Sequence, residues 1–146
     1  MTIVALVRYL HFLGIIGIAG SLVSQHLMVA DEMTPAQVRR ISAANKIYGL
    51  SVLLALGAGI ALWVAVGKPK EFYTKNGLFH AKVGLFILMG AASVIPTKFF
   101  KKSRSSESNV ALPKSVLMSI RFQLLLLLAI PLLATLMAQG IGLSAE

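Results

Sequence analysis

Four long apolar runs dominate this chain of 146 residues and constrain its fold more than any other feature. A helix needs about 20 consecutive apolar residues to cross the hydrocarbon core of a bilayer. Four segments reach this length, at about residues 3–29, 47–66, 78–100 and 116–141. The sequence therefore predicts an all-α, integral membrane four-helix bundle that forms a single domain over residues 1–146.

The composition supports a membrane solvent. Charged residues make up 13% of the chain, whereas a soluble domain carries about 25%. The chain has no cysteine, which excludes disulfides, zinc-thiolate sites and iron–sulfur clusters. One local signal is a capping box at Thr34-Pro35-Ala36-Gln37. It marks either the start of the second long helix near Pro35 or a separate short surface helix.

The net charge of +9 resides mostly in short loops between the apolar runs. This placement favours contact with the lipid bilayer and its anionic lipids over nucleic acid. The second loop carries three basic residues: Lys68, Lys70 and Lys75. The first and third carry eight: Arg39, Arg40, Lys46, Lys98, Lys101, Lys102, Arg104 and Lys114. Because basic loops stay in the cytoplasm, both termini are predicted to lie on the outer side.

Several ionisable side chains fall inside the predicted spans, where they are costly and suggest a function. Arg8, His11, His80 and Lys82 all belong to the outer half of the membrane, whereas the remaining two, His26 and Arg121, are interpreted as interfacial anchors near the cytoplasmic ends. No acidic residue lies in any span. A basic cluster without a carboxylate calls for an anionic partner, such as a lipid phosphate, an anionic substrate or the propionates of a haem.

A haem b held between two helices uses these residues best. His11 and His80 would be the axial ligands of the haem iron, with Arg8 and Lys82 binding the propionates. Arg8 and His11 share a helix face, but His80 and Lys82 are two residues apart and point to different faces. The sequence leaves open which of those two faces the core. Small residues near the ligands would leave room for the ring: Gly14, Gly17 and Gly84.

Several runs of residues also resemble known families. They are Arg8-Tyr9-Leu10-His11-Phe12-Leu13-Gly14, Tyr48-Gly49-Leu50, Phe79-His80-Ala81-Lys82-Val83-Gly84-Leu85-Phe86 and Pro96-Thr97. Together they resemble an uncharacterised family of predicted bacterial inner-membrane proteins without an established activity. That resemblance implies a multi-pass protein of the bacterial inner (cytoplasmic) membrane, so the predicted outer side is periplasmic.

The same pieces are more distantly similar to HemJ-type protoporphyrinogen oxidases and CopD-type membrane domains. HemJ proteins carry a basic residue three positions before a histidine, as Arg8 and His11 do, and a later His-x-Lys, as His80 and Lys82 do. They bind haem b, so this resemblance implies haem here. The chain departs from HemJ at Ser93-Val94-Ile95-Pro96, where HemJ has a Tyr-His pair. It also lacks the Arg-x-x-Asn-Glu-x-Pro motif, which puts the oxidase activity in doubt.

The sequence thus leaves three hypotheses open. The first is a small haem b protein for electron transfer, with quinone or another redox protein as partner; as an enzyme it would be a haem-dependent membrane oxidoreductase. The second is a HemJ-like porphyrinogen oxidase. The third is a non-redox transporter or accessory subunit that binds an anion or lipid through a basic outer pocket. A CopD-like copper function is disfavoured by scattered methionines. Small residues on the second helix leave a homo-oligomer open.

Overall fold

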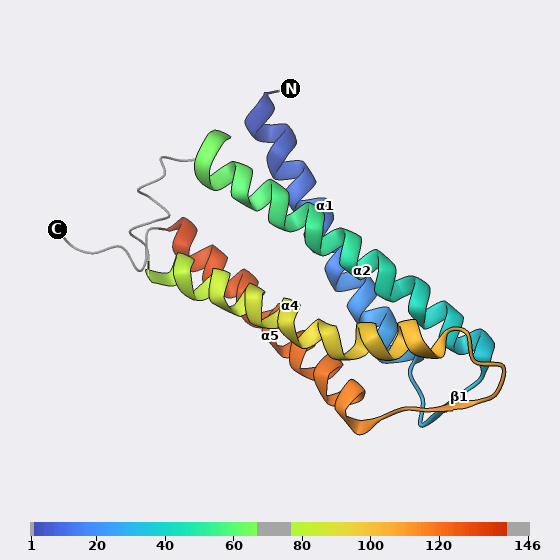
Figure 1. The fold of residues 1–146 in the computed structure, drawn as a ribbon. Helices are drawn as coiled ribbons and strands as arrows, with labels where there is room; N and C mark the ends of the chain where they lie inside the picture. The colour runs from blue at the N-terminus through green and yellow to red at the C-terminus, as the bar shows by residue number, and fades with distance from the viewer. Residues whose placement is uncertain (1, 67–76, 140–146) are drawn as a thin grey trace.

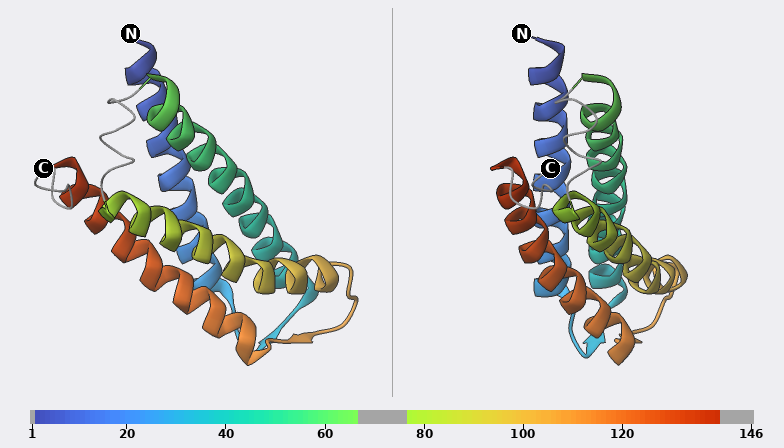
Figure 2. Two further views of the ribbon diagram at one scale, coloured as in Figure 1. Left: turned by 60° about the vertical axis from the view of Figure 1, so that its left-hand side comes forward. Right: turned by 90° about the vertical axis from the view of Figure 1, so that its left-hand side faces the viewer.

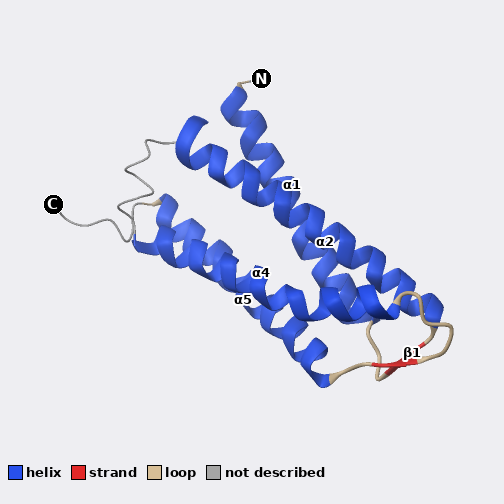
Figure 3. Cartoon of the chain, in the orientation of Figure 1, coloured by secondary structure: helices blue, strands red, loops and turns tan. Residues whose placement is uncertain are grey.

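The computed structural model of the chain describes residues 2–66 and 77–139. These residues form four long α-helices, one π-helical segment and one two-stranded sheet (Figures 1 and 3). Each long helix is apolar enough to cross a membrane, which confirms the predicted all-α fold with four apolar helices. In chain order the elements are α1 (Ile3–Met28), β1 (Glu32–Met33), α2 (Pro35–Ala61), η1 (Leu62–Val66), α4 (Gly77–Ser103), β2 (Val110–Ala111) and α5 (Lys114–Ala138).

Hydroxyl caps fix where the first two helices begin. The amide of Ala5 donates to the Thr2 hydroxyl oxygen at 3.1 Å. At the start of α2, the Gln37 amide donates to Thr34 Oγ1 at 3.3 Å, and the Thr34 amide donates to Gln37 Oε1 at 2.8 Å. This is the predicted capping box, and each cap of this kind stabilises a helix by about 1 kcal/mol. Because α2 continues from Pro35 without a break, the alternative of a separate surface helix is wrong.

The helices are arranged as two pairs that form a V. α1 packs mainly on α2, and α4 packs mainly on α5. The pairs meet at the end that bears β1 and separate toward the end where α1 begins and α5 ends (Figures 1 and 2). β1 and β2 pair antiparallel, with Glu32 opposite Ala111 and Met33 opposite Val110. We call the end with this sheet the closed end and the other the open end.

The apolar core lies toward the closed end. Among its fully buried side chains are Leu22, Met33, Ile41, Phe100 and Ile120. Other large apolar side chains remain on the outside, including Leu27 and Leu128, each 77% exposed. Water would penalise such a surface, whereas lipid tails are as apolar as the side chains themselves. The exposed apolar surface therefore fits a bundle that packs its inner faces together and turns its outer faces to lipid.

Basic residues of two predicted loops gather at the closed end. Arg39 and Arg40 lie in the first turns of α2, Lys101 and Lys102 lie in the last turn of α4, and Lys114 begins α5. The structure thereby places the first and third loops at the same end of the molecule. The three basic residues of the second loop, Lys68, Lys70 and Lys75, lie outside the described residues.

Candidate functional site

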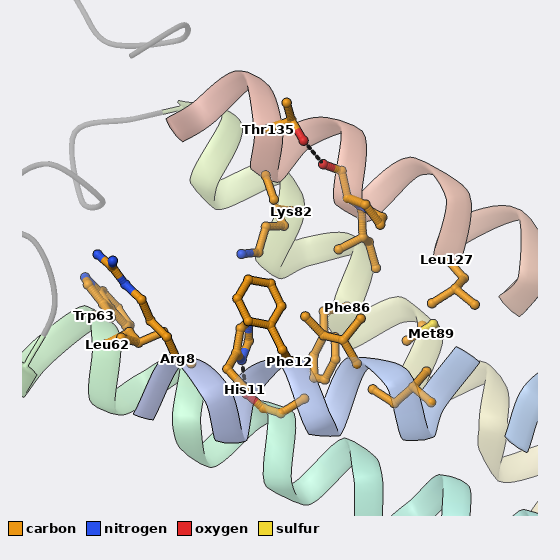
Figure 4. A pocket seen from close by; sticks show the side chains of 17 residues that line it. Arg8, His11, Phe12, Leu62, Trp63, Lys82, Phe86, Met89, Leu127 and Thr135 are labelled. Carbon is orange, nitrogen blue, oxygen red and sulfur yellow. Dashed lines mark hydrogen bonds between the residues drawn. The ribbon is translucent and has the colours of Figure 1, made fainter. Parts of the chain in front are cut away.

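A cavity of about 410 Å³ lies between the two helix pairs, toward the open end (Figure 4). Its walls are mainly apolar and come from α1, α2, η1, α4 and α5. Among the residues that the structure describes, its basic lining residues are Arg8, His11 and Lys82, and none of its lining residues is acidic. The other lining residues are Phe12, Ile15, Ile18, Ala55, Gly59, Leu62, Trp63, Phe86, Met89, Leu127, Ile130, Pro131, Ala134 and Thr135.

His11 is held in the cavity wall by the neighbouring helix α2. Its Nδ1 lies 2.8 Å from the backbone oxygen of Ala55. A carbonyl oxygen only accepts hydrogen bonds, so Nδ1 carries the hydrogen and donates it. In the neutral ring, Nε2 is then the nitrogen with a free lone pair. Gly59 leaves room for the ring, because a Cβ at that position would lie 3.2 Å from His11 Cε1.

Arg8 and Lys82 bring basic groups to the same cavity from two different helices. Arg8 lies one turn before His11 on α1, as the spacing of three residues predicts. Lys82 reaches the cavity from α4. Figure 4 shows the Lys82 side chain extending from α4 into the space above the His11 ring. The two helix pairs thus contribute three basic residues to the lining of one cavity, and we call these residues the basic cluster.

His80 lies apart from this cluster. It is exposed and does not line the cavity, although it makes an interaction of its own. Of the two residues that the sequence could not distinguish, Lys82 is therefore the one that faces the cavity. The structure brings together Arg8, His11 and Lys82 but not His80, and coordination of one iron by both histidines stays a prediction.

The glycines near the basic cluster have a different role from the predicted one. A Cβ at Gly14 would lie 2.6 Å from the Ala55 amide nitrogen, and a Cβ at Gly17 would lie 2.8 Å from Ser51 Cβ. These glycines let α1 approach α2 closely, and Gly84 has no atom near its Cβ position. For Gly14 and Gly17, the prediction that they leave room for a haem ring is therefore wrong, because these positions are filled by α2. For Gly84, whose Cβ position is open, it stays a prediction. Gly59, for which the sequence predicts no such role, lines the cavity.

Sequence reasoning missed the aromatic and α5 residues of the site. Trp63 belongs to η1, where the helix widens to a π-helical turn, a feature that often occurs at functional sites. Thr135 lines the cavity from α5, and its hydroxyl donates to the Pro131 carbonyl at 2.9 Å. Neither residue carries a charge that would mark it as part of a site, and an aromatic residue at the end of a span, such as Trp63, is typical of an interfacial anchor. A π-helical turn has no simple sequence signal.

Comparison with known proteins adds a family. Residues 3–142 match the family described as predicted membrane protein (DUF2214). The chain belongs to this family. No curated protein and no solved structure is significantly similar to it. For this DUF2214 protein, the match agrees with the four apolar helices and with the resemblance to an uncharacterised membrane family. In the described part of the chain, no group of three or more His, Cys, Asp or Glu residues could hold a metal ion.

Proposed function

We propose that this membrane protein binds an amphipathic anion in the cavity between its helix pairs, as a transporter or an accessory subunit would. The ligand would have one anionic group, a carboxylate or a phosphate, and an apolar body. The observation that carries this proposal is the basic cluster of Arg8, His11 and Lys82 in a cavity whose remaining lining is almost entirely apolar.

The charge balance of the cavity argues for an anion. Lys82 is partly buried, and burying a cation in a low-dielectric interior is costly unless an opposite charge accompanies it. The described acidic residues, Asp31, Glu32 and Glu107, all lie in the connections at the closed end, away from the cluster. A ligand carboxylate or phosphate would supply the missing charge, and the Arg8 guanidinium could bind it through two parallel hydrogen bonds.

The walls argue for an apolar body attached to that anionic group. Below the basic cluster the cavity is lined by Ile15, Ile18, Phe86, Met89 and Leu127. An inorganic anion would leave this surface unused, whereas an acyl or isoprenoid chain would fill it. The predicted ligand therefore places its head at the open end of the cavity and its chain toward the floor.

Binding of a fluorescent long-chain fatty acid to the protein in mild detergent tests this proposal. Each charge-assisted hydrogen bond contributes about 1.5–3 kcal/mol, so Arg8→Gln or Lys82→Gln should weaken binding about 10- to 100-fold. Arg121→Gln is the matched control, because Arg121 is exposed on α5 and does not line the cavity. Equal affinities for all three variants and the native protein would refute the assignment of the cluster.

A second candidate function is binding of haem b for electron transfer, with quinone or another redox protein as partner. The hydrogen bond from His11 Nδ1 to the Ala55 carbonyl favours it, because ligating histidines commonly donate their other nitrogen in this way. Haem would supply one-electron chemistry, with Arg8 and Lys82 on its propionates. His80, the predicted second ligand, would have to reach the iron from outside the cavity lining described above.

An absorption spectrum of the purified protein separates the two candidates. A haem b protein would show a Soret band that sharpens on reduction and disappears in His11→Ala. A spectrum that stays featureless after expression with a haem precursor would remove this candidate. It would also remove a HemJ-like porphyrinogen oxidase, which complementation of a strain lacking that enzyme tests directly.

We also propose that the closed end faces the cytoplasm of a bacterium and that both termini face the periplasm. The basic residues of the first and third connections support this orientation, since they would contact the anionic inner leaflet. The chain contains no native cysteine, so labelling of a single introduced cysteine shows on which side of the membrane that position lies. Ser105→Cys should resist a membrane-impermeant thiol reagent in intact cells, whereas Thr2→Cys should react; the reverse result would invert the topology.

A further inference from the structure

All four long helices carry neutral polar side chains on the closed-end side of the cavity. The floor of the cavity includes Ile18, Met89 and Leu127. Three or four residues away on the same helices, about one helical turn nearer the closed end, lie Ser21, Ser93 and Gln123. We call the whole set the polar layer; its members are Ser21, Gln25, Asn45, Tyr48, Ser93, Ser119 and Gln123.

Two amide side chains on the α1–α2 side of this layer bond to each other. Asn45 Nδ2 donates to Gln25 Oε1 at 3.1 Å, and Gln25 Nε2 donates to the Ser21 backbone oxygen at 3.3 Å. The Gln25 side chain is 1% exposed, and both ends of its amide have partners. Gln25 and Asn45 therefore bond to each other, whereas Tyr48, also on α2, takes no part in this pairing.

A proline organises the opposite side. Pro96 has no amide hydrogen, so the Ala92 carbonyl lacks its donor within α4. The Ser119 hydroxyl of α5 donates to that carbonyl instead, as neighbouring helices commonly do for prolines in spans. Since the Ser119 hydrogen is used there, Gln123 Nε2 must be the donor in its 3.4 Å contact with Ser119 Oγ. This fixes the orientation of the Gln123 amide.

Two buried oxygen atoms of the layer then remain without a hydrogen-bond partner. They are Gln123 Oε1 and the Tyr48 hydroxyl oxygen. Gln123 is 1% exposed and Tyr48 is 3% exposed. Tyr48 lies beside Ser93 of α4 without meeting hydrogen-bond geometry, and the Ser93 hydroxyl donates to the Gly90 carbonyl. Tyr48 thus adjoins Ser93, and Gln123 contacts Ser119, whose hydroxyl bonds to the neighbouring Ala92 carbonyl.

We propose that this part of the polar layer forms a second binding site, which holds a water molecule or another small hydroxylic ligand between Tyr48 and Gln123. Gln123 Oε1 only accepts, so the ligand must donate a hydrogen bond to it. The Tyr48 hydroxyl can then donate to the same ligand. The lone pairs of the Ser93 hydroxyl offer a further contact, which gives the two to four polar partners that a buried water requires.

Physical chemistry makes such a ligand the expected solution. Lipid tails offer no donor, and an unsatisfied polar group in the bilayer core is strongly unfavourable. No charged side chain belongs to the layer, so a neutral ligand matches it, in contrast to the anion proposed for the cavity. The inference is therefore independent of the proposed function.

Nuclear magnetic resonance of the native protein in detergent, with water as the probe, tests this site. A cross-relaxation peak between water and the side-chain amide protons of Gln123 is expected. Gln25 is the internal control, because it is equally buried and both its amide nitrogen and its amide oxygen have protein partners, so it should give no such peak. Absence of a peak at both glutamines would overturn the proposal, as would peaks of equal intensity at both.

A thermal double-mutant cycle supplies the second measurement. Tyr48→Phe and Gln123→Met each remove one partner of a shared ligand, so each should lower the midpoint temperature of unfolding. The double variant should fall by clearly less than the sum of the two shifts. Gln25 and Asn45, which bond directly, provide the positive control for such coupling. Strictly additive shifts, or a higher midpoint in either single variant, would show that the two oxygens share no ligand.

Discussion

The contact between α1 and α2 at Gly14 yields the sharpest quantitative prediction. A Cβ added at Gly14 would lie 2.6 Å from the Ala55 amide nitrogen and 2.8 Å from its Cα. Both atoms are backbone, so the clash cannot be relieved by rotating a side chain, and α2 itself must move. Overpacking of this kind costs about 1–3 kcal/mol, which exceeds the gain of up to about 1 kcal/mol that alanine brings to a helix.

Gly20 provides a matched control on the same helix. A Cβ there meets no atom within 4 Å, so Gly20→Ala should leave stability unchanged or raise it by up to about 1 kcal/mol. Gly14→Ala should therefore be less stable than Gly20→Ala by roughly 1–3 kcal/mol, since the gain in helix propensity is common to both. Reversible unfolding of both variants in mixed detergent micelles measures this difference.

Gly14→Ala should also weaken ligand binding in the cavity. Ala55 supplies the carbonyl that accepts the His11 hydrogen bond, so displacing α2 should weaken anion binding in Gly14→Ala but not in Gly20→Ala. Equal stability and equal binding in the two variants would refute the reasoning, because it would mean that α1 and α2 do not approach as closely as described.

Two further predictions concern single contacts. Ser119→Ala should destabilise the protein by about 1–3 kcal/mol, because it leaves the Ala92 carbonyl unpaired. In a Pro96→Ala background the restored amide can donate to that carbonyl, so thermal unfolding should show a much smaller loss of stability. An equal loss of stability in both backgrounds would contradict the role of Ser119 as the donor to Ala92. Gly59→Val should place methyl groups against the His11 ring and weaken fatty acid binding several-fold in the same fluorescence titration, and unchanged affinity would show that the ring position does not matter.

Features of the fold that depend on local signals can be predicted from the sequence. Long apolar runs predict spanning helices, and the capping box at Thr34 predicts where the second helix begins. The spacing of Arg8 and His11 also predicts that they share a face, and both do line the cavity. Each of these inferences needs only the geometry of a single helix and no knowledge of its neighbours.

Features that depend on how two helices meet were less accessible. The positions of His80 and Lys82 differ by two residues, so one must turn away, and only the packing of α4 decides which. Gly14 was interpreted as space for a ligand because a glycine looks the same whether it faces a cavity or another backbone. The distance from the Cβ position of Gly14 to the Ala55 backbone shows that this glycine faces another helix and not a cavity. That distance follows from the register of α1 on α2.

The polar layer was missed for another reason. Its members are neutral, and a search for ionisable residues in spans passes over glutamine, serine and tyrosine. One signal was present: a proline inside a span, such as Pro96, frees a carbonyl that needs a donor from elsewhere. That reasoning predicts a hydroxyl on a neighbouring helix, although the pairing with Ser119 requires the antiparallel register of α4 and α5.

The most direct test of the central claim compares two ligands that differ only in charge. The native protein in mild detergent would be titrated with a long-chain fatty acid and with the corresponding primary amide, which has the same chain and no charge. Anion binding by the basic cluster predicts at least about tenfold tighter binding of the acid, equivalent to about 1.4 kcal/mol. Equal affinity for the acid and the amide would contradict it, since the cavity would then recognise only the apolar chain.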